Sequence, residues 1–394
     1  MRRTSITYRC LLPVFTGCLL SSCIEPFEVT FRDFESALVI DATLTNELKQ
    51  QKILISRTYR FEDEGAAGVS GATVQVVSED GSRYDFTETD SGTYVSSEVF
   101  AAQTNVGYTL LVGTKDGQEY TSDIARTSGT SKIDSLYAQR VSNDFGEEGM
   151  GMFLNASNLD SDTNFYRYEY EETYKIIAPE WNPVELDVDE EIDPPGIFFT
   201  TRSLGERVCY GSNSSNKIIL ASTENLNEGR ISNFMVHFVD RNNYILSHRY
   251  SILVRQYSQS TRAHDFYETL NNFSNSESLF SETQPGFLEG NISPIGNQDE
   301  KVLGYFNVVN VDEKRIFFNY EDFFPGERLP PYVDPCREGA PGIGLIDLVR
   351  WDLVKYVRDN EGEFPGAGPY VTVPEVCGDC TVLGSSEIPE FWID

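Results

Sequence analysis

The feature that most restricts the fold of this chain is a close succession of short strand-like runs and turn signals from residue 37 onward. The runs are residues 37–42 (ALVIDA), 53–58 (ILISRT), 72–77 (ATVQVV) and 108–112 (YTLLV), and turn signals such as 79–81 (EDG) and 90–92 (DSG) separate them. Roughly seven short strands within about 90 residues are typical of an antiparallel β-sandwich. We therefore expect residues 37–125 to form an N-terminal antiparallel β-sandwich domain.

The rest of the chain is predicted to be a larger β-rich C-terminal domain over residues 135–394. Its predicted strands are residues 165–174 (FYRYEYEETY), 233–240 (NFMVHFVD), 250–257 (YSILVRQY), 302–311 (VLGYFNVVNV) and 315–320 (RIFFNY). The small, polar residues 125–132 predict a linker before it. One main helix should begin at Ser260 or Thr261 and run to about Asn272, because apolar residues recur there at three- and four-residue spacing. Residues 345–357 fit neither the helix nor the strand period.

The first 22 residues have the organisation of an export signal. Arginines at positions 2, 3 and 9 precede an apolar stretch at 10–20, which Pro13 interrupts and which is too short to span a bilayer. The stretch leads into LSSC at 20–23, which resembles a bacterial lipobox. We expect residues 1–22 to be a lipoprotein signal peptide, Cys23 to carry the membrane lipid, and residues 23–36 to be a lipidated tether. The alternative is an ordinary secretory signal with an incidental cysteine.

Four cysteines remain beyond Cys23, namely Cys209, Cys336, Cys377 and Cys380. An even number of cysteines in an exported chain favours two disulfides, for which three connectivities are possible. The spacing of Cys377 and Cys380 (CGDC) would also suit a thioredoxin-like redox pair or, with the other two cysteines, a zinc site. Pro374 just before the pair and an oxidising compartment favour structural disulfides over both alternatives.

Charge and motif content restrict the function further. The chain has 62 acidic and 31 basic residues, giving a formal net charge of −31, so repulsion disfavours nucleic acid as a partner. No nucleophile elbow, phosphate-binding loop or dinucleotide fingerprint occurs. The three histidines, His237, His248 and His264, do not fall at metal-ligand spacings. We therefore predict no catalytic residues, no metal site and no cofactor.

Two acidic segments suggest calcium binding at first sight. Asp160 begins a loop with Glu171 at its twelfth position, as in a calcium-binding loop, but position six is Phe165 instead of the required glycine. Residues 185–193 are rich in acids and precede two prolines. We interpret the first segment as a turn that enters a strand and the second as a solvated acidic loop.

Two groups of aromatic residues could serve either as core or as a binding face. They are Tyr166, Tyr168 and Tyr170 in one predicted strand, and Phe317, Phe318 and Phe323 in and after another. Exposed rings could stack on sugars or anchor a partner protein. Packing in a β-sandwich core is the favoured interpretation.

Two family resemblances add to this reading. Residues 71–74 (GATV), 80–81 (DG), 92–94 (GTY) and 108–110 (YTL) resemble carboxypeptidase-regulatory-like and transthyretin-like domains. Nearly the whole mature chain resembles the domain-of-unknown-function 4249 family of Bacteroidetes-type outer-membrane lipoproteins. The residues that carry it are 72–74 (ATV), 92–94 (GTY), 209–210 (CY), 287–292 (FLEGNI), 302–306 (VLGYF), 377–380 (CGDC) and 389–392 (PEFW). This resemblance implies an outer-membrane lipoprotein, often encoded beside TonB-dependent receptors of the SusC type, and implies no enzymatic activity.

These observations lead to one functional expectation and two alternatives. We expect a non-enzymatic outer-membrane lipoprotein, anchored in lipid through Cys23, that binds a TonB-dependent (SusC-type) receptor barrel and assists nutrient uptake. The alternatives are a scaffold lipoprotein of an envelope assembly or secretion complex, and a surface hydrolase without a recognisable motif. Acidic residues soon after Cys23, among them Glu25 and Glu28, favour the cell surface over the periplasmic face.

Overall fold

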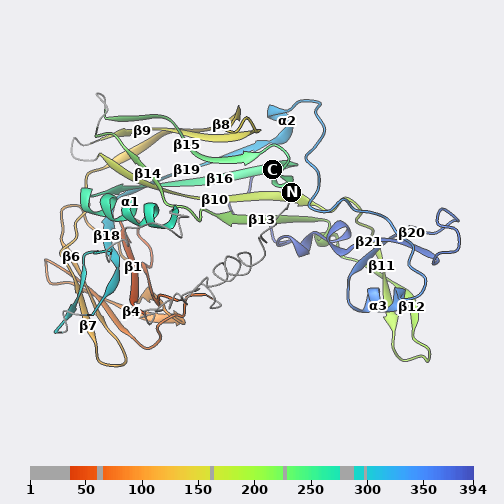
Figure 1. Cartoon of the computed structure of the whole chain (residues 1–394), viewed down its shortest axis with the longest axis horizontal. Coiled ribbons are helices and arrows are strands. Elements are labelled where there is room, and N and C mark those ends of the chain that lie inside the picture. The colour runs from red at the N-terminus through yellow and green to blue at the C-terminus, as the bar shows by residue number, and fades with distance from the viewer. Residues whose placement is uncertain (1–35, 60–64, 160–163, 225–228, 276–287, 297–299) are drawn as a thin grey trace, which may run out of the picture.

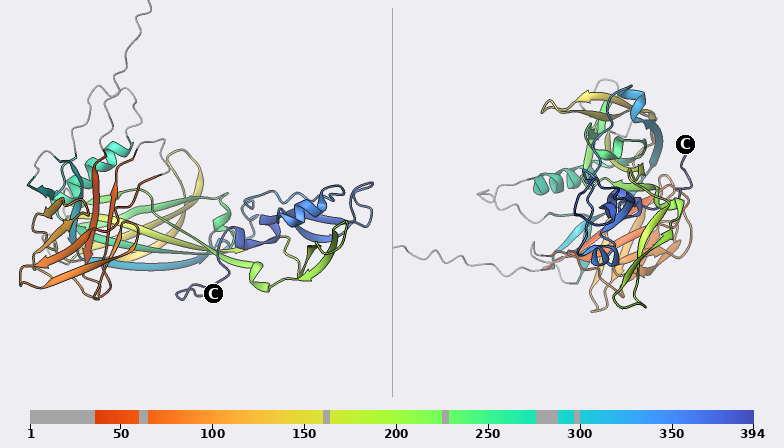
Figure 2. Two further views of the ribbon diagram at one scale, coloured as in Figure 1. Left: turned by 90° about the horizontal axis from the view of Figure 1, so that it is seen from below. Right: turned by 90° about the vertical axis from the view of Figure 1, so that its right-hand side faces the viewer.

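The computed structural model of the 394-residue chain describes residues 36–59, 65–159, 164–224, 229–275, 288–296 and 300–394. The fold is mainly β, as the sequence predicts, and has three parts (Figure 1). A curled sheet lies at one end, a β-sandwich lies in the middle, and a smaller C-terminal lobe extends from the other end (Figure 2). The predicted signal peptide and Cys23 lie outside the described residues. Within those residues, no helix is long and apolar enough to cross a membrane.

The curled sheet has nine strands in the order β17-β7-β6-β3-β4-β5-β2-β1-β18. They are β1 (Leu38–Thr45), β2 (Lys52–Arg57), β3 (Thr73–Ser78), β4 (Arg83–Asp90), β5 (Thr93–Ser96), β6 (Tyr108–Gly113), β7 (Glu119–Ser122), β17 (Ile292–Ile295) and β18 (Val302–Val309). Neighbouring strands are antiparallel except β1 and β18, which are parallel. Ile292 and Phe306, from opposite ends of this order, share one buried core, so the sheet curls back on itself. The strands expected within 37–125 are thus completed by two strands from the range 135–394.

Asn291 joins the two edges of the curled sheet. Its side chain is buried, its Nδ2 donates to the Phe306 carbonyl oxygen at 2.8 Å, and its Oδ1 accepts from the Phe306 N–H at 2.7 Å. Two glycines permit the close approach. A Cβ on Gly290 would lie 1.7 Å from the Gly304 carbonyl oxygen, and Gly304 has a φ of +137°, which disfavours other residues. A side-chain amide therefore supplies the hydrogen bonds that a neighbouring strand would otherwise make.

The middle part is a sandwich of two sheets. One has the order β13-β10-β16-β19, with β14 also paired to β10, and the other has the order β15-β9-β8. The strands are β8 (Ser131–Ser142), β9 (Glu148–Asn158), β10 (Phe165–Ile177), β13 (Val208–Ser214), β14 (Ile219–Ser222), β15 (Arg230–Asp240), β16 (Arg249–Gln259) and β19 (Val311–Asn319). The short 3-10 helix η2 (Tyr244–Leu246) precedes β16, and η1 (Leu204–Glu206) leads from the C-terminal lobe into β13. Tyr166 and Tyr168 of β10 pack between the sheets with Leu154 of β9. These tyrosines fill the core, as the favoured interpretation predicts.

The predicted main helix is confirmed as α1 (Thr261–Asn275). Ser260 Oγ accepts a hydrogen bond from the Ala263 N–H at 3.2 Å, which makes Ser260 the cap of the first turn. Phe266 and Tyr267 pack with Tyr305 of β18. The helix contacts both β18 and β10, so it lies where the curled sheet meets the sandwich (Figure 1).

The C-terminal lobe, defined here as residues 182–206 and 333–382, contains two hairpins and short helices. The hairpins are β11 (Val184–Asp189) with β12 (Gly196–Thr201), and β20 (Val354–Asp359) with β21 (Tyr370–Pro374). The helices are α3 (Leu345–Arg350), α4 (Glu375–Gly378) and η3 (Cys380–Val382), while α2 (Tyr320–Phe323) follows β19 outside the lobe. Residues 345–357 therefore contain a helix followed by the start of a strand, which explains why neither period fits them.

Candidate functional site

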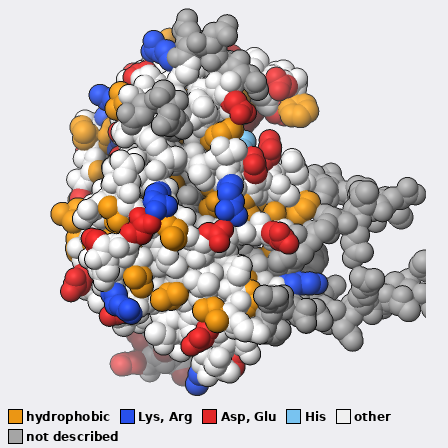
Figure 3. Space-filling model, turned by 90° about the vertical axis from the view of Figure 1, so that its left-hand side faces the viewer, with side chains coloured by type: hydrophobic (Ala, Val, Ile, Leu, Met, Phe, Trp, Pro, Cys, Tyr) orange, Lys and Arg blue, Asp and Glu red, His pale blue; other side chains and the backbone are white. Residues whose placement is uncertain are grey.

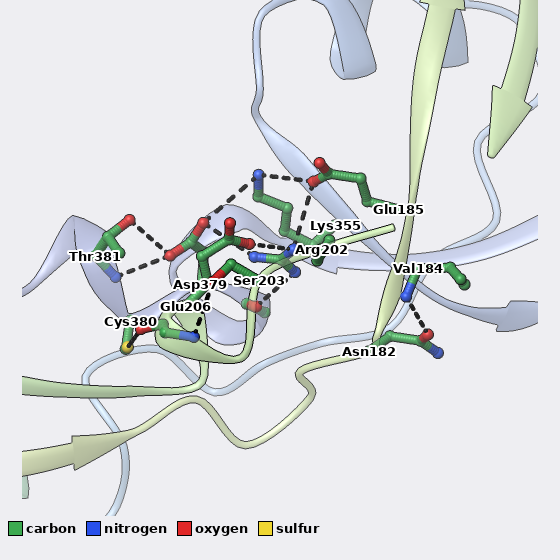
Figure 4. Close-up of polar contacts among 12 residues, drawn as sticks. Asn182, Val184, Glu185, Arg202, Ser203, Glu206, Lys355, Asp379, Cys380 and Thr381 are labelled. Carbon is green, nitrogen blue, oxygen red and sulfur yellow. Dashed lines mark hydrogen bonds and ion pairs between the residues drawn. The ribbon is translucent and has the colours of Figure 1, made fainter. Parts of the chain in front are cut away.

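A buried cluster of charges holds the C-terminal lobe together (Figure 4). It centres on Arg202, which follows β12 and whose side chain is fully buried. The guanidinium donates to Glu206 Oε2 at 2.6 Å and to Asp379 Oδ2 at 3.0 Å. A further hydrogen bond reaches the Gly378 carbonyl oxygen at 2.8 Å. Arg202 therefore connects the first hairpin to the segment that follows the second.

Lys355 of β20 extends this cluster. Its Nζ lies 2.6 Å from Asp352 Oδ1, 3.5 Å from Glu185 Oε2 and 3.7 Å from Asp379 Oδ2. Burial alone would lower the pKa of Lys355, but the carboxylates of Asp352 and Glu185 outweigh it, so the pKa is raised. The lysine thus stays charged and connects β11 to β20.

Two disulfides fix the lobe further. Cys209 of β13 is bonded to Cys380, and Cys336 is bonded to Cys377, each with a Cα–Cα distance of 5.6 Å. The first disulfide ties the lobe to an edge strand of the sandwich, and the second joins two segments within the lobe. Cys377 and Cys380 are each bonded to a distant cysteine, so they form neither a redox pair nor a set of free thiols for zinc.

The lobe presents large apolar side chains to solvent. They include Ile192, Phe198, Phe199, Ile343, Trp351 and Leu353, and we call these six the lobe apolar set. Trp351 is 65% exposed and Leu353 is 50% exposed. Phe199 is held edge-on against two rings of the other hairpin, with centroid distances of 5.1 Å to Tyr356 and 5.4 Å to Tyr370. A cross-linked, ion-paired support therefore displays these apolar groups to solvent.

Acidic residues accompany these apolar side chains. In the acidic segment 185–193, Glu185 belongs to the buried cluster and Glu190 pairs with Arg350 of α3 at 2.7 Å. Part of the segment expected to be a solvated loop is thus the strand β11. The end of the molecule opposite the lobe has a mixed surface. Figure 3 shows hydrophobic side chains scattered among acidic and basic ones on the visible face of the curled-sheet end.

A second polar cluster lies between the sheets of the sandwich. Glu172 of β10 is buried and accepts hydrogen bonds from Tyr250 Oη and from Asn213 Nδ2, the latter at 2.9 Å. His237 Nε2 lies 3.1 Å from the same carboxylate. Burial raises the pKa of Glu172, but these hydrogen bonds outweigh burial and hold the pKa below its ordinary value. Sequence reasoning missed this cluster because its members come from four strands.

A cavity of about 990 Å³ lies between the sandwich and residues 328–332. Two of its charged lining residues, Glu148 and Arg241, belong to a network of ion pairs. Arg241 Nη1 lies 2.7 Å from Glu148 Oε2, and Arg140 lies 2.7 Å from Glu148 and 2.6 Å from Glu327. Hydrogen bonds from Arg140 and Arg241 lower the pKa of Glu148. The carboxylate is therefore held as a permanent anion rather than poised to exchange a proton near neutral pH.

The remaining residues that the sequence singled out are dispersed. Glu171, the twelfth position of the calcium-type loop, lies in β10 and pairs with Arg255 at 2.6 Å, while Asp160 lies outside the described residues. Phe318 is buried in the sandwich core, and Phe323 packs edge-on against it with a centroid distance of 5.4 Å. Phe317 contacts Trp392 of the C-terminal segment, with centroids 5.7 Å apart.

Comparisons with known proteins give a family but no activity. No curated protein matches the chain. Among solved structures, a DUF4785 family protein from Legionella pneumophila shows 8% identity and a TM-score of 0.18, with 55% of this chain and 51% of that chain covered. The chain thus spans about half the length of that protein. The model of the domain of unknown function DUF4249 matches residues 24–315, which include the curled sheet and most of the sandwich. This match covers more than half of the 394 residues, and the chain therefore belongs to the DUF4249 family.

Proposed function

We propose that this chain is a non-enzymatic lipoprotein of the outer membrane that binds a protein partner through its C-terminal lobe. The observation that carries the proposal is the lobe apolar set, displayed on a support fixed by two disulfides and buried ion pairs. Protein interfaces are enriched in aromatic anchors such as Trp351 and Phe199. A rigid support lowers the entropy lost on binding, so such groups can contribute affinity efficiently.

The position of the lobe is compatible with attachment at the other end of the molecule. The strand β1, which begins shortly after the tether, belongs to the curled sheet, whereas the lobe lies at the opposite end (Figure 1). An anchor at Cys23 would therefore leave the lobe free to meet a partner. We propose a TonB-dependent, SusC-type receptor barrel as that partner, nutrient uptake as the process, and the cell surface as the location. Three features of the sequence favour this part of the proposal: the lipobox-like LSSC sequence, the acidic residues after Cys23 and the family resemblance.

Of the two alternative functions, a scaffold role would use the same lobe apolar set to bind a different partner. A scaffold of an envelope assembly or secretion complex would also need an exposed apolar lobe, so the identity of the bound protein distinguishes the two. A surface hydrolase has less support. Glu172 and His237 are largely enclosed between two sheets, and Glu148 is neutralised by two arginines.

A site-specific photo-crosslink tests the proposal. The photoreactive residue p-benzoylphenylalanine replaces Trp351 in the full chain, produced at native level, and the matched control carries it at Phe145. Phe145 is 89% exposed and lies in the turn between β8 and β9, outside the lobe. We expect one discrete membrane-protein adduct from position 351 and none from position 145. Mass spectrometry of the adduct then distinguishes a receptor barrel from an assembly or secretion component.

Loss-of-binding variants complete the test. Trp351→Ser with Leu353→Ser should reduce recovery of the partner in detergent extracts at least tenfold, whereas Phe145→Ser should not change it. Both changes affect exposed side chains, so folding should be preserved, and circular dichroism checks this. The proposal is wrong if the wild-type chain, after chemical crosslinking in the membrane, is recovered without any bound partner protein. It is also wrong if the photo-crosslinked adduct at position 351 persists unchanged when Leu353 and the exposed phenylalanines of β12 are replaced by serine.

A further inference from the structure

Three potential metal ligands lie together on α1. His264 Nδ1, a carboxylate oxygen of Asp265 and one of Glu268 all lie within 4.8 Å of one another. The distance from His264 Nδ1 to Asp265 Oδ1 is 3.8 Å. His264 and Glu268 are four residues apart, so they project from the same face of the helix. The side chains of Asp265 and Glu268 are exposed and can adjust, whereas His264 is buried.

The unusual member of this group is His264. The residue is only 9% exposed, and its buried Nδ1 has no hydrogen-bond partner among the described residues. Its ring lies against Phe165, with centroids 4.5 Å apart, so its orientation is restricted. Buried polar atoms nearly always have a partner, and one that lacks it needs an explanation such as a bound ion. In neutral imidazole, an unprotonated Nδ1 offers a lone pair suited to a metal.

The carboxylates alone would not indicate a site. Asp265 and Glu268 are exposed on α1, and acidic side chains are common on exposed helix surfaces without any ligand. A buried imidazole nitrogen that makes no hydrogen bond with any described residue is not common in the same way. The combination of that nitrogen with two carboxylates at short range is what points to a cation.

We propose that His264 Nδ1, together with the carboxylates of Asp265 and Glu268, binds a divalent transition-metal ion, for which zinc is the best match. Zinc binds imidazole nitrogen and carboxylate oxygen at about 2.0–2.2 Å, so two ligands on one tetrahedral ion lie roughly 3.4 Å apart. The His264–Asp265 separation of 3.8 Å is close to that value. The carboxylate of Glu268 lies within 4.8 Å of the other two ligand atoms and its side chain is exposed, so it can turn toward the ion, and water would complete the coordination. Calcium and magnesium prefer sets made of oxygen alone.

The ion would lie near the junction of two parts of the fold. Since α1 contacts β10 of the sandwich and β18 of the curled sheet, metal bound on α1 should stabilise that junction. Binding should therefore be visible as a rise in the unfolding temperature as well as in direct titration.

The direct test is calorimetric titration of the metal-free mature chain with zinc chloride. We expect one ion per chain and at least a tenfold loss of affinity in His264→Ala. The matched control is His248→Ala, which removes a histidine outside α1 and should leave the affinity unchanged. The inference is overturned if the wild-type chain binds no zinc, or if His264→Ala binds it as the wild type does.

Because His264 is buried, its alanine variant could also disturb folding. The double variant Asp265→Asn with Glu268→Gln changes only exposed side chains and keeps the imidazole in place. Zinc should raise the unfolding temperature of the wild type but not of this variant. With cobalt as the probe, the wild type should show the visible absorption bands of a bound ion, and the double variant should not. Equal calcium stabilisation of the wild type and His264→Ala, without any effect of zinc, would show an oxygen-only site and refute the assignment.

Discussion

Replacing Arg202 with methionine tests whether buried ion pairs hold the C-terminal lobe in place. Methionine keeps most of the apolar stem but removes the guanidinium that bonds Glu206, Asp379 and the Gly378 carbonyl oxygen. The matched control is Arg350→Met. Arg350 also pairs with an acid of the first hairpin, Glu190, but its side chain is 36% exposed.

The structure sets the expected magnitudes. Removing one partner of a buried ion pair destabilises a protein by about 3–5 kcal/mol, because the other charge is left uncompensated. Asp379 is 9% exposed and would keep Lys355 at 3.7 Å and two hydrogen bonds from Thr381, while Glu206, at 29% exposure, can regain some water. We therefore expect a loss near the lower limit, about 3 kcal/mol, for Arg202→Met. An exposed pair contributes about 0–1 kcal/mol, which is the range expected for Arg350→Met.

Native-state hydrogen exchange followed by mass spectrometry measures the opening of the lobe directly. Peptides from β11, β12, β20 and β21 should exchange much faster in Arg202→Met, while peptides of the curled sheet should keep their wild-type rates. The reasoning is refuted if the lobe peptides of Arg202→Met keep the wild-type opening free energy. It is also refuted if Arg350→Met accelerates them as strongly.

Three other changes test separate features. Cys23→Ala should remove the lipid and release the protein from the membrane fraction, and mass spectrometry that finds an unmodified wild-type Cys23 would contradict the anchor. Asn291→Leu leaves the buried N–H and C=O of Phe306 without partners and should lower the free energy of unfolding by about 2–4 kcal/mol in urea denaturation. An unchanged urea midpoint would show that Asn291 does not close the sheet. Glu172→Gln should remove a pH-dependent part of the stability. Because the pKa of Glu172 lies below its ordinary value of 4.5, the carboxylate stabilises fully above about pH 4.5, and this contribution is lost as the pH falls through the folded-state pKa. The difference in stability between the wild type and Glu172→Gln should therefore narrow below pH 4.5, whereas parallel pH profiles would contradict the hydrogen-bonded carboxylate.

Local patterns in the sequence account for the parts of the fold that could be predicted. The helix at 260–272 was predictable because its apolar residues recur on one face, and the structure places α1 at Thr261–Asn275. The strand at 165–174 was predictable because tyrosines alternate with charged residues, and it corresponds to β10. Glu172 lies in the same core-facing register as Tyr168 and Tyr174, so an acid at a position where the alternation places a buried ring marks the polar cluster.

Relations between distant residues could not be predicted in the same way. The parallel pairing of β1 with β18 depends on strands at opposite ends of the matched family region, and neither strand carries a sign of its partner. The four cysteines allowed three connectivities, and only the structure selects Cys209–Cys380 and Cys336–Cys377. The buried role of Arg202 was equally invisible, because its partner Asp379 lies 177 residues away in the chain.

The parallel strand β18 has a consequence for the order in which the protein can be assembled. Since a ribosome makes the chain from its N-terminus, β1 and β2 exist long before residues 302–309, and one edge of β1 then has no neighbour. Unpaired edges are prone to join other chains, and closing such a long loop slows folding. Nascent chains that stop before β18 should therefore aggregate or need a chaperone, and residues 37–125 expressed alone should not behave as a soluble module.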